Sequence, residues 1–314
     1  MHAITRAVVT LLAASLGFAV AAPAEAQETP WTVSTAANDF GAGRDNYSYT
    51  AAPGDRIDDG LVIANHGSVP LDLAVYAADA FTAESGQLDL LAHAKPSTGV
   101  GAWVHPAHDR VTVRPGQSAQ VPFTLALPAD ATPGDHLGGI LASLTQGDVE
   151  RRVGLRIRLR VGGDLRPALA VENLDMRYSG TIDPLGTGDA TLAYTIRNSG
   201  NAVVTARQSA TATGPFGSLR VAADPIPDSP PLLPGETWQV TAAVHGVTPA
   251  LYLAGTVSLV PLLTDAAGST TPLSGVDTTA HSSAVPWTAV LFIVLCVLLI
   301  VFLVVRRRKR AHAG

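Results

Sequence analysis

The chain has 314 residues, of which 47% are hydrophobic and 15% are charged, and its formal net charge is −5. Six of its 21 basic residues lie in the two terminal segments described below, which leaves 15 against 25 acidic residues in the part between them, a net charge of −10. Because phosphate binding needs a basic face, this acidity argues against nucleic acid as a partner. The one cysteine, Cys296, lies in an apolar C-terminal run, so the preceding region has neither a disulfide nor a thiol nucleophile.

The N-terminus has the pattern of a secretory signal peptide. Arg6 provides a basic start, residues 7–20 form an apolar stretch, and residues 24–26 (AEA) match an A-x-A cleavage site. We therefore expect residues 1–26 to be removed and the chain from Gln27 to be exported. An exported chain without disulfides favours a bacterial surface.

From Gln27 to Leu263, short apolar runs alternate with clusters of Gly, Pro, Asn and Asp every eight to twelve residues. This spacing predicts an all-β chain of the sandwich type. The predicted strands are 31–34, 47–51, 56–65, 71–80, 110–113, 118–127, 137–144, 152–161, 168–178, 190–198, 203–213, 238–244 and 252–259.

An internal repeat divides this region in two. An apolar strand that ends in NHG (residues 65–67) recurs as a strand that ends in NSG (residues 198–200), and a Pro-Gly turn at residues 115–116 recurs at residues 234–235. Asn and Gly tolerate the positive φ that such turns need. Two tandem copies of one β-sandwich module account for the repeat, with a boundary near residues 162–164.

We assign residues 30–163 to the first sandwich and residues 164–268 to the second. The apolar periodicity is lost after Leu263, and Ser, Thr and Pro become frequent. This composition predicts an extended stalk over residues 269–285.

The C-terminal end has the pattern of a membrane anchor. Residues 288–305 are eighteen positions without a charge, about the length that crosses a hydrocarbon core of roughly 30 Å. Trp287 stands at one lip of this run, where an indole ring favours the interface. We expect a single transmembrane helix at residues 286–305 and, by the positive-inside rule, a short cytoplasmic tail at residues 306–314. The cations of that tail are Arg306, Arg307, Arg308, Lys309 and Arg310.

No catalytic or cofactor motif is present in the sequence, which contains no G-x-S-x-G, H-E-x-x-H, S-x-x-K or P-loop pattern. His105 and His108 form the best metal-like cluster, but a zinc site needs three or four converging ligands, and a surface loop is the simpler interpretation. Asp55, Asp58 and Asp59 lack the alternation of a calcium loop. We therefore expect neither a catalytic site nor a metal site.

Residues 152–161 (RVGLRIRLRV) place four arginines on one face of a strand and apolar residues on the other. One interpretation is a cationic ladder for an anionic wall polymer or an acidic partner. The other is an exposed face that is balanced by acidic residues on neighbouring strands. The arginines are Arg152, Arg156, Arg158 and Arg160.

Several short motifs follow one another in a characteristic order. These motifs are the APGD turn at residues 52–55, the strand IANHG at residues 63–67, DAFT at residues 79–82, Trp103, and the segment PGDHLGGI at residues 133–140. Their order resembles that in the WxL-interacting proteins of Gram-positive bacteria. The resemblance implies two immunoglobulin-like modules on a membrane anchor. It further implies that the first module binds peptidoglycan and the second binds WxL-type or other surface proteins.

We therefore expect a non-enzymatic, single-pass protein of the cell surface, with its N-terminal part outside. Its partners would be peptidoglycan or another wall polymer, a surface protein, and the membrane through the C-terminal helix. The candidate contact residues are Trp103, His105, His108, Arg152, Arg156, Arg158 and Arg160.

Three alternatives remain open. An assembly chaperone or adhesin that binds only protein clients would present a long exposed edge strand in the first sandwich. A sortase substrate would need L-P-x-T-G before the apolar run, where residues 271–275 read TPLSG. An exported enzyme would need a cleft lined by converging His and carboxylate side chains.

Overall fold

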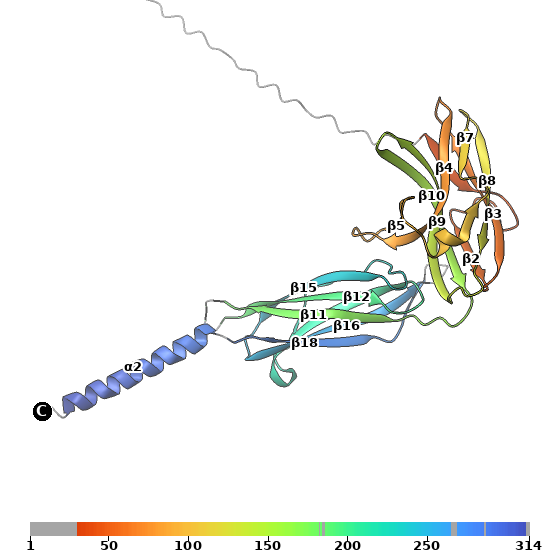
Figure 1. The fold of residues 1–314 in the computed structure, drawn as a ribbon. Helices are drawn as coiled ribbons and strands as arrows, with labels where there is room; N and C mark the ends of the chain where they lie inside the picture. The colour runs from red at the N-terminus through yellow and green to blue at the C-terminus, as the bar shows by residue number, and fades with distance from the viewer. Residues whose placement is uncertain (1–29, 182, 184–185, 265–268, 286, 312–314) are drawn as a thin grey trace, which may run out of the picture.

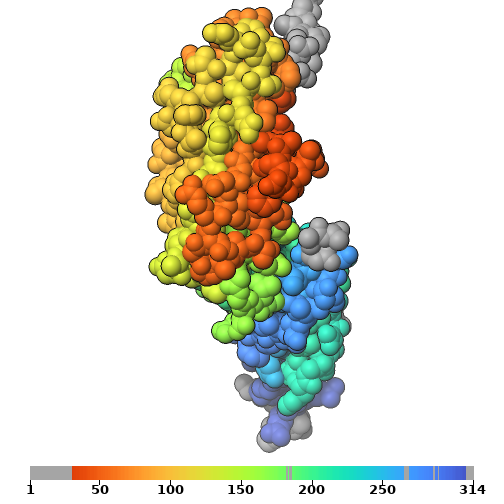
Figure 2. Space-filling model, turned by 90° about the vertical axis from the view of Figure 1, so that its right-hand side faces the viewer, coloured from red at the N-terminus to blue at the C-terminus, as the bar shows by residue number. Residues whose placement is uncertain are grey.

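The computed structural model describes residues 30–181, 183, 186–264, 269–285 and 287–311, so the expected signal peptide lies outside the described residues. The described chain forms two β-sandwiches followed by one long helix (Figure 1). We call residues 30–161 domain one and residues 169–283 domain two. In the space-filling view, domain one lies directly against one end of domain two (Figure 2). The predicted fold class, two tandem sandwiches plus a C-terminal apolar helix, is confirmed.

Domain one is a pair of sheets packed face to face. The first sheet has the order β1-β3-β8-β6 and the second the order β2-β10-β9-β4-β5, with β7 also paired to β4. Only β2 and β10 run parallel, and the arrangement is that of an immunoglobulin-like sandwich. The elements are β1 Trp31–Thr35, β2 Tyr47–Ala51, β3 Arg56–Asn65, β4 Leu71–Thr82, β5 Leu88–Leu90, α1 Val100–Trp103, β6 Val104–Pro106, β7 Arg110–Val113, β8 Ser118–Ala126, β9 Gly134–Gln146 and β10 Val149–Val161.

Domain two repeats the design with a three-stranded sheet of order β11-β12-β15 and a second sheet of order β14-β13-β16-β17, in which β18 also pairs with β16. Its elements are β11 Leu169–Ser179, β12 Gly188–Asn198, β13 Val204–Thr213, the short 3-10 turn Pro215–Gly217, β14 Val221–Ala222, β15 Thr237–Val247, β16 Tyr252–Thr264, β17 Thr270–Pro272 and β18 Val276–Ser283.

Each sandwich encloses its own apolar core, because successive side chains of a strand point to opposite faces. In β12, Leu192, Tyr194 and Ile196 are buried and the residues between them face outward. The core of domain one is built in the same way around Trp31 and Ile140, which are both fully buried. The two cores are separate clusters, so each domain has its own source of apolar stabilisation.

The internal repeat corresponds to one hydrogen-bond set that occurs in both domains. The side-chain amide of Asn65 donates to the carbonyl oxygens of Val69 and Val113 and accepts from the amide of Gly67. Asn198 repeats these bonds with Ala202, Leu232 and Gly200. Both asparagines are almost completely buried. In each domain the asparagine, at the end of β3 or β12, therefore ties the turn that follows its strand to the segment that precedes the Pro-Gly turn.

A buried ion pair fixes the crossing from β1 to β2. The Arg44 guanidinium donates to both carboxylate oxygens of Asp59, at 2.7 and 2.9 Å, and the Tyr49 hydroxyl donates to the same carboxylate at 2.6 Å. Burial acts to raise the pKa of Asp59, but the hydrogen bonds from Arg44 and Tyr49 outweigh it and the pKa is lowered. The pair holds residues 36–46 on the sandwich and so positions the start of β2.

The expected stalk over residues 269–285 is wrong. Strands β17 and β18 lie in this segment, and β18 pairs with β16 from Tyr252–Ser283 to Leu259–Val276. The segment is polar because β18 is an edge strand whose side chains are mostly exposed, so its composition resembles that of a linker. Domain two therefore continues to Ser283, beyond the expected end at residue 268.

The last element, α2, spans Trp287–Ala311. Within it, Val290–Arg308 has a mean hydropathy of 2.9 and no residue buried against the rest of the described chain. This helix is long and apolar enough to cross a membrane. It begins only three residues after the end of β18.

Replacement of Asn198 tests the repeated hydrogen-bond set. Asn198→Ala removes three hydrogen bonds at a buried position, to the carbonyl oxygens of Ala202 and Leu232 and from the amide of Gly200, so we expect the free energy of unfolding to fall by about 2–4 kcal/mol. The exposed neighbour Ser199 provides the control, since Ser199→Ala should change it by less than about 0.5 kcal/mol. Urea unfolding of the detergent-solubilised protein measures both, and equal effects would contradict the assignment.

The Asp59 ion pair predicts a loss of stability in acid. The pKa of Asp59 is lower in the folded than in the unfolded chain, so its stabilising effect is present above the unfolded value of about 3.9 and is lost as the pH falls through the lowered pKa. Asp59→Asn should remove this part of the acid dependence, whereas Asp39→Asn, at an exposed position of the loop that carries Arg44, should retain it. Urea midpoints between about pH 5.5 and 2.5 test the difference.

Candidate functional site

The predicted cationic ladder exists as a strand but not as a free surface. Arg160 pairs with Asp135 at 2.8 Å, and Arg152 lies 3.7 Å from Asp89 and donates to the carbonyl oxygen of Leu90. These two arginines therefore hold parts of the domain together. Of the two interpretations left open by the sequence, balance by acidic neighbours applies to this pair.

Arg156 and Arg158 are different. Among the described residues, neither guanidinium has a hydrogen bond or an ion pair. Both line a groove of about 390 Å³ between the domains, which we call the interdomain groove. The residues that line it are Asn46, Tyr47, Ser48, Leu88, Leu137, Arg156, Arg158, Val203, Val204, Thr205, Pro231 and Thr264.

The groove has an apolar floor next to its two cations. Leu137 of β9, Val203 and Leu233 form a small buried cluster between the domains, and Leu88 packs against it. The cations come from the adjacent strand β10. A ligand that fits would combine apolar groups with a carboxylate, because guanidinium groups pair with carboxylates by charge-assisted hydrogen bonds.

A buried carboxylate fixes the joint beside the groove. Asp135 accepts from the Arg160 guanidinium in domain one and, at 3.0 Å, from the amide of Val203 in domain two. Asn201 continues the joint: its side chain donates to the carbonyl oxygen of Pro133, and its own carbonyl oxygen accepts from the Asp135 amide at 2.8 Å. Gly134 permits this close approach, since a Cβ there would overlap the carbonyl oxygen of Asn201.

A second set of hydrogen bonds joins the domains on the β4 side. The amide and hydroxyl of Thr82 donate to the two carboxylate oxygens of Glu236 at 2.7 and 2.6 Å. Glu236 also accepts from the amide of Leu233 at 2.9 Å. With two separate attachments, the walls of the interdomain groove are held at a fixed separation.

Strand β10 has a free edge that leads into the groove. β9 pairs with β10 along its full length, whereas β2 pairs only with residues 157–161. Among the described strands, residues 149–156 therefore pair with β9 alone. The hairpin of β9 and β10 extends beyond the sandwich, where Val149 is 59% exposed.

The direction of the free backbone groups follows from two hydrogen bonds. The amides of Arg156 and Gly162 donate toward the β2 side, to the Asn46 side chain and to the Ala51 carbonyl oxygen. Because backbone groups alternate along a strand, the other even-numbered residues point the same way. The N–H and C=O groups of residues 150, 152 and 154 thus face outward, and among the described residues they have no partner.

The other sequence candidates lie elsewhere. Trp103 is half-buried and its ring contacts that of His136, with centroids 4.9 Å apart. His105 is on β6 in the sheet opposite β10, and His108 is exposed in the following turn. The structure therefore does not bring these three residues together with Arg156 and Arg158.

Within the described part of the chain, no group of three His, Cys, Asp or Glu residues could hold a metal ion. The acidic run at residues 55–59 is instead divided among different partners. Asp55 accepts from the amide of Ala52, Asp58 from Thr124, and Asp59 from Arg44.

Sequence reasoning missed the residues that build the joint and the groove floor. Asp135, Asn201 and Glu236 lie in turns or at strand ends, where polar residues are common and give no distinctive signal. The chaperone alternative predicts an exposed edge strand in the first sandwich, but the sequence does not identify which strand it is. Whether β10 has a free edge depends on the length of β2, and the alternation of residues within β10 contains no information about that length.

No protein-family model matches the sequence, and no curated protein matches it. Solved structures with a similar arrangement of strands include the class 5 fimbriae chaperone CfaA, which is 9% identical with a TM-score of 0.38 and covers 79% of this chain and 98% of its own. The E. coli chaperone DraB is 9% identical with a TM-score of 0.33 over 79% and 96% of the two chains.

A family 123 glycoside hydrolase from Clostridium perfringens is 13% identical with a TM-score of 0.31, and the match covers 42% of this chain and 27% of the hydrolase. At these identities and TM-scores, none of the comparisons assigns a function to this chain. Membership of the WxL-interacting family stays a prediction.

Replacement of Asp135 tests the joint. Asp135→Ala removes the acceptor of the Val203 amide, so we expect hydrogen exchange at Val203 to become at least tenfold faster. Asp164, whose ion pair with Arg166 is exposed, provides the control. Asp164→Ala should leave the Val203 rate unchanged, because exposed pairs contribute little. Protection of Val203 that persists in Asp135→Ala would contradict the role of this carboxylate.

Proposed function

We propose that this chain is a non-enzymatic, membrane-anchored surface protein that binds an extended segment of a protein partner. The partner segment adds as a strand to the free edge of β10 and ends in the interdomain groove. The observation that carries this proposal is the continuity of the edge with the groove: Arg156 lies at the end of the unpaired part of β10 and also lines the groove.

The free edge favours a peptide over other ligands. Residues 150, 152 and 154 offer three N–H and three C=O groups at the spacing of a strand, and a second extended chain supplies the complementary groups. An unpaired edge also promotes aggregation with other strands, so an exposed edge is unfavourable unless it binds a partner. Gly154 lines a second hollow beside the edge, together with Arg152 and Arg156.

The groove supplies direction and specificity. The floor, formed by Leu88, Leu137 and Val203, provides contacts for apolar side chains. The unpaired guanidinium groups of Arg156 and Arg158 can donate hydrogen bonds to a carboxylate. We therefore expect the partner segment to carry an acidic group beside an apolar one. The carboxylate is either an acidic side chain or a chain terminus.

Binding of peptidoglycan, the first expectation from the sequence, has no comparable support. Two of the four arginines of the strand are already paired, and the ring of Trp103 is in contact with His136. Among the predicted contact residues that the structure describes, Arg156 and Arg158 are therefore the arginines without a partner. They do not extend into a row of free cations, and the ring of Trp103 is not free. These two arginines fit an acidic protein segment as well as a polymer, and the adjacent free edge favours the protein.

The location follows from the ends of the chain. The signal-like pattern at residues 1–26, the apolar length of α2 and the basic run that begins at Arg306 support a location of the two sandwiches outside the cytoplasmic membrane. Domain one then faces away from the membrane and presents the β10 edge to partners.

A crosslinking experiment tests the proposal. A benzoylphenylalanine residue at position 150, on the free edge, should form adducts with a surface protein when cells that produce the chain are irradiated. The same residue at position 193, on the exposed face of strand β12 where both sides are paired, should form few or none. Adducts that wall-digesting enzymes convert to free glycan fragments, or equal yields at both positions, would contradict the proposal.

Paired variants separate the strand edge from the cations. Glu150→Pro removes one outward N–H without removing a β9–β10 bond, so capture should fall at least fivefold relative to Glu150→Ala. Arg156→Glu/Arg158→Glu should also reduce capture at least fivefold. The control Arg110→Glu/Arg114→Glu makes the same change of net charge elsewhere on domain one and should have little effect. Capture that depends on neither the edge nor the two arginines would overturn the proposed site.

A further inference from the structure

The end of domain two that precedes α2 must lie close to the membrane. Strand β18 ends at Ser283 and the helix begins at Trp287, so three residues connect them. Three extended residues reach about 10 Å, and the headgroup layer on each side of a bilayer is about 5–8 Å thick. Whatever the tilt of the helix, this end of the domain stands at the level of the headgroups.

The strand register identifies which loops share this end. Tyr252, the first residue of β16, pairs with Ser283, and Ala254 pairs with Thr213, the last residue of β13. The loop at residues 214–220 follows β13, and the loop at residues 248–251 precedes β16. Both loops therefore project from the same end of the domain as the connection to α2.

These two loops carry unusually exposed apolar side chains. Phe216 is fully exposed, Leu251 is 72% exposed, and Leu219 and Tyr252 are each almost half exposed. We call the two loops, together with Tyr252 at the start of β16, the juxtamembrane apolar loops. In the rest of the described part of domain two, the most exposed large apolar side chain is that of Val276, at 37%. Contiguous exposed apolar groups mark an interaction surface.

The backbone of the loops is strained as well. Phe216, Leu219 and Leu251 have φ values of 59°, 53° and 25°, a region that bulky side chains rarely adopt. Among the described residues that are not glycine, the one other case is Asn173, and asparagine tolerates this region. The loops thus combine backbone strain with exposed apolar surface, and a cost of this kind points to a function.

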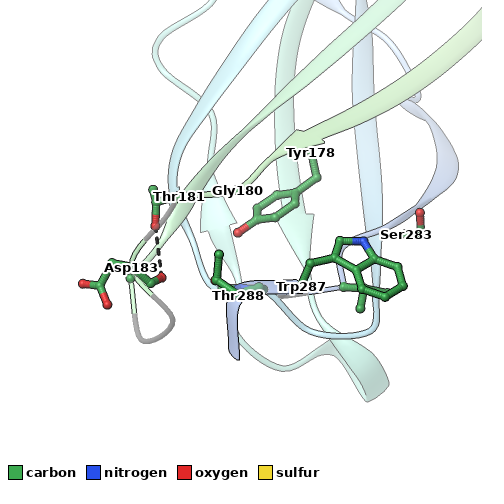
Figure 3. A pocket seen from close by; sticks show the side chains of 10 residues that line it. Tyr178, Gly180, Thr181, Asp183, Ser283, Trp287 and Thr288 are labelled. Carbon is green, nitrogen blue, oxygen red and sulfur yellow. Dashed lines mark hydrogen bonds between the residues drawn. The ribbon is translucent and has the colours of Figure 1, made fainter. Parts of the chain in front are cut away.

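Aromatic rings flank the same end. A hollow of about 330 Å³ lies between the base of domain two and the first turn of α2, and Tyr178 and Trp287 both line it (Figure 3). The indole of Trp287 is 74% exposed. Tyrosine and tryptophan are the residues that favour the interface between lipid and water.

We propose that the juxtamembrane apolar loops insert into the headgroup region of the outer leaflet and seat domain two on the bilayer. This inference rests on the proposed membrane anchoring by α2. The partner is the lipid surface itself, because the loops are continuous with the membrane-spanning helix and lie within reach of the headgroups.

Apolar burial drives the insertion. The two loops, residues 214–220 and 248–251, contain a single charged residue, Arg220. Attraction to anionic lipids needs a cluster of basic residues, so binding here should not depend on lipid charge or on salt. Seating of this kind restricts the tilt of domain two and so fixes the height at which the interdomain groove stands above the membrane.

A fluorescent probe on the loop tests the proposal. In the full chain with Cys296→Ser, which removes the one native cysteine, Ser218→Cys carries an environment-sensitive dye in phosphatidylcholine nanodiscs. We expect a blue-shifted emission and at least a twofold loss of intensity with nitroxide-labelled lipids. The values should be unchanged with 20% phosphatidylglycerol or in 0.5 M NaCl. Ser199→Cys, at the exposed far end of β12 about 35 Å away, should show neither effect.

Matched variants give the second readout. Phe216→Ser/Leu219→Ser should abolish quenching at position 218 while the protein stays in the membrane fraction after carbonate extraction. Val69→Ser, at an exposed apolar position of domain one, should change neither. A probe at position 218 that is as accessible to aqueous iodide as the probe at position 199 would overturn the inference but leave the anchoring intact. Shielding from iodide without quenching by labelled lipids would overturn it in favour of a protein contact, and release by carbonate would instead overturn the anchoring.

Discussion

The buried amide of Asn198 is the interaction on which the arrangement of the two domains depends. A buried amide that lacks its partners is costly, so the two segments that it bonds are held in one conformation. One segment carries Asn201 and Val203 and the other leads to Glu236, and all three residues bond to domain one. Asn65 makes the same bonds in domain one. The described chain has no further domain before domain one, so these bonds support no second joint.

From this joint follow the properties of the groove. Asp135 and Glu236 attach domain one to domain two at two places, which leaves the apolar cluster around Leu137 enclosed and the arginines of β10 at its rim. The same strand uses Arg152 and Arg160 to stabilise the domain and leaves Arg156 and Arg158 without partners. The arginines of this strand thus have two roles: one pair stabilises domain one and the other pair remains available to a ligand. The difference arises because Asp89 and Asp135 lie beside the first pair.

The direct passage from β18 into α2 has a consequence for how the molecule would work. With three connecting residues, and with α2 in a membrane as proposed, domain two would stand directly at the bilayer, and its base would meet the lipid with apolar rather than polar loops. The groove then lies about one strand length, roughly 35 Å, above the membrane. A partner held there stays close to the membrane surface, at a height set by a rigid domain instead of a flexible linker.

The sequence by itself determined the features that depend on local order. Alternation of apolar residues predicted most strands, the Asn-x-Gly and Pro-Gly turns predicted two copies of one sandwich, and the uncharged run after Trp287 predicted the helix, because the periods of strands and helices are short-range properties. Only the tertiary structure decided which arginines are free, that residues 276–283 form a strand, and that Phe216 and Leu251 lie at one end of domain two. Each of these depends on a partner far away in the chain, such as Asp135 for Arg160, and pairing across that distance leaves no periodic trace in the sequence.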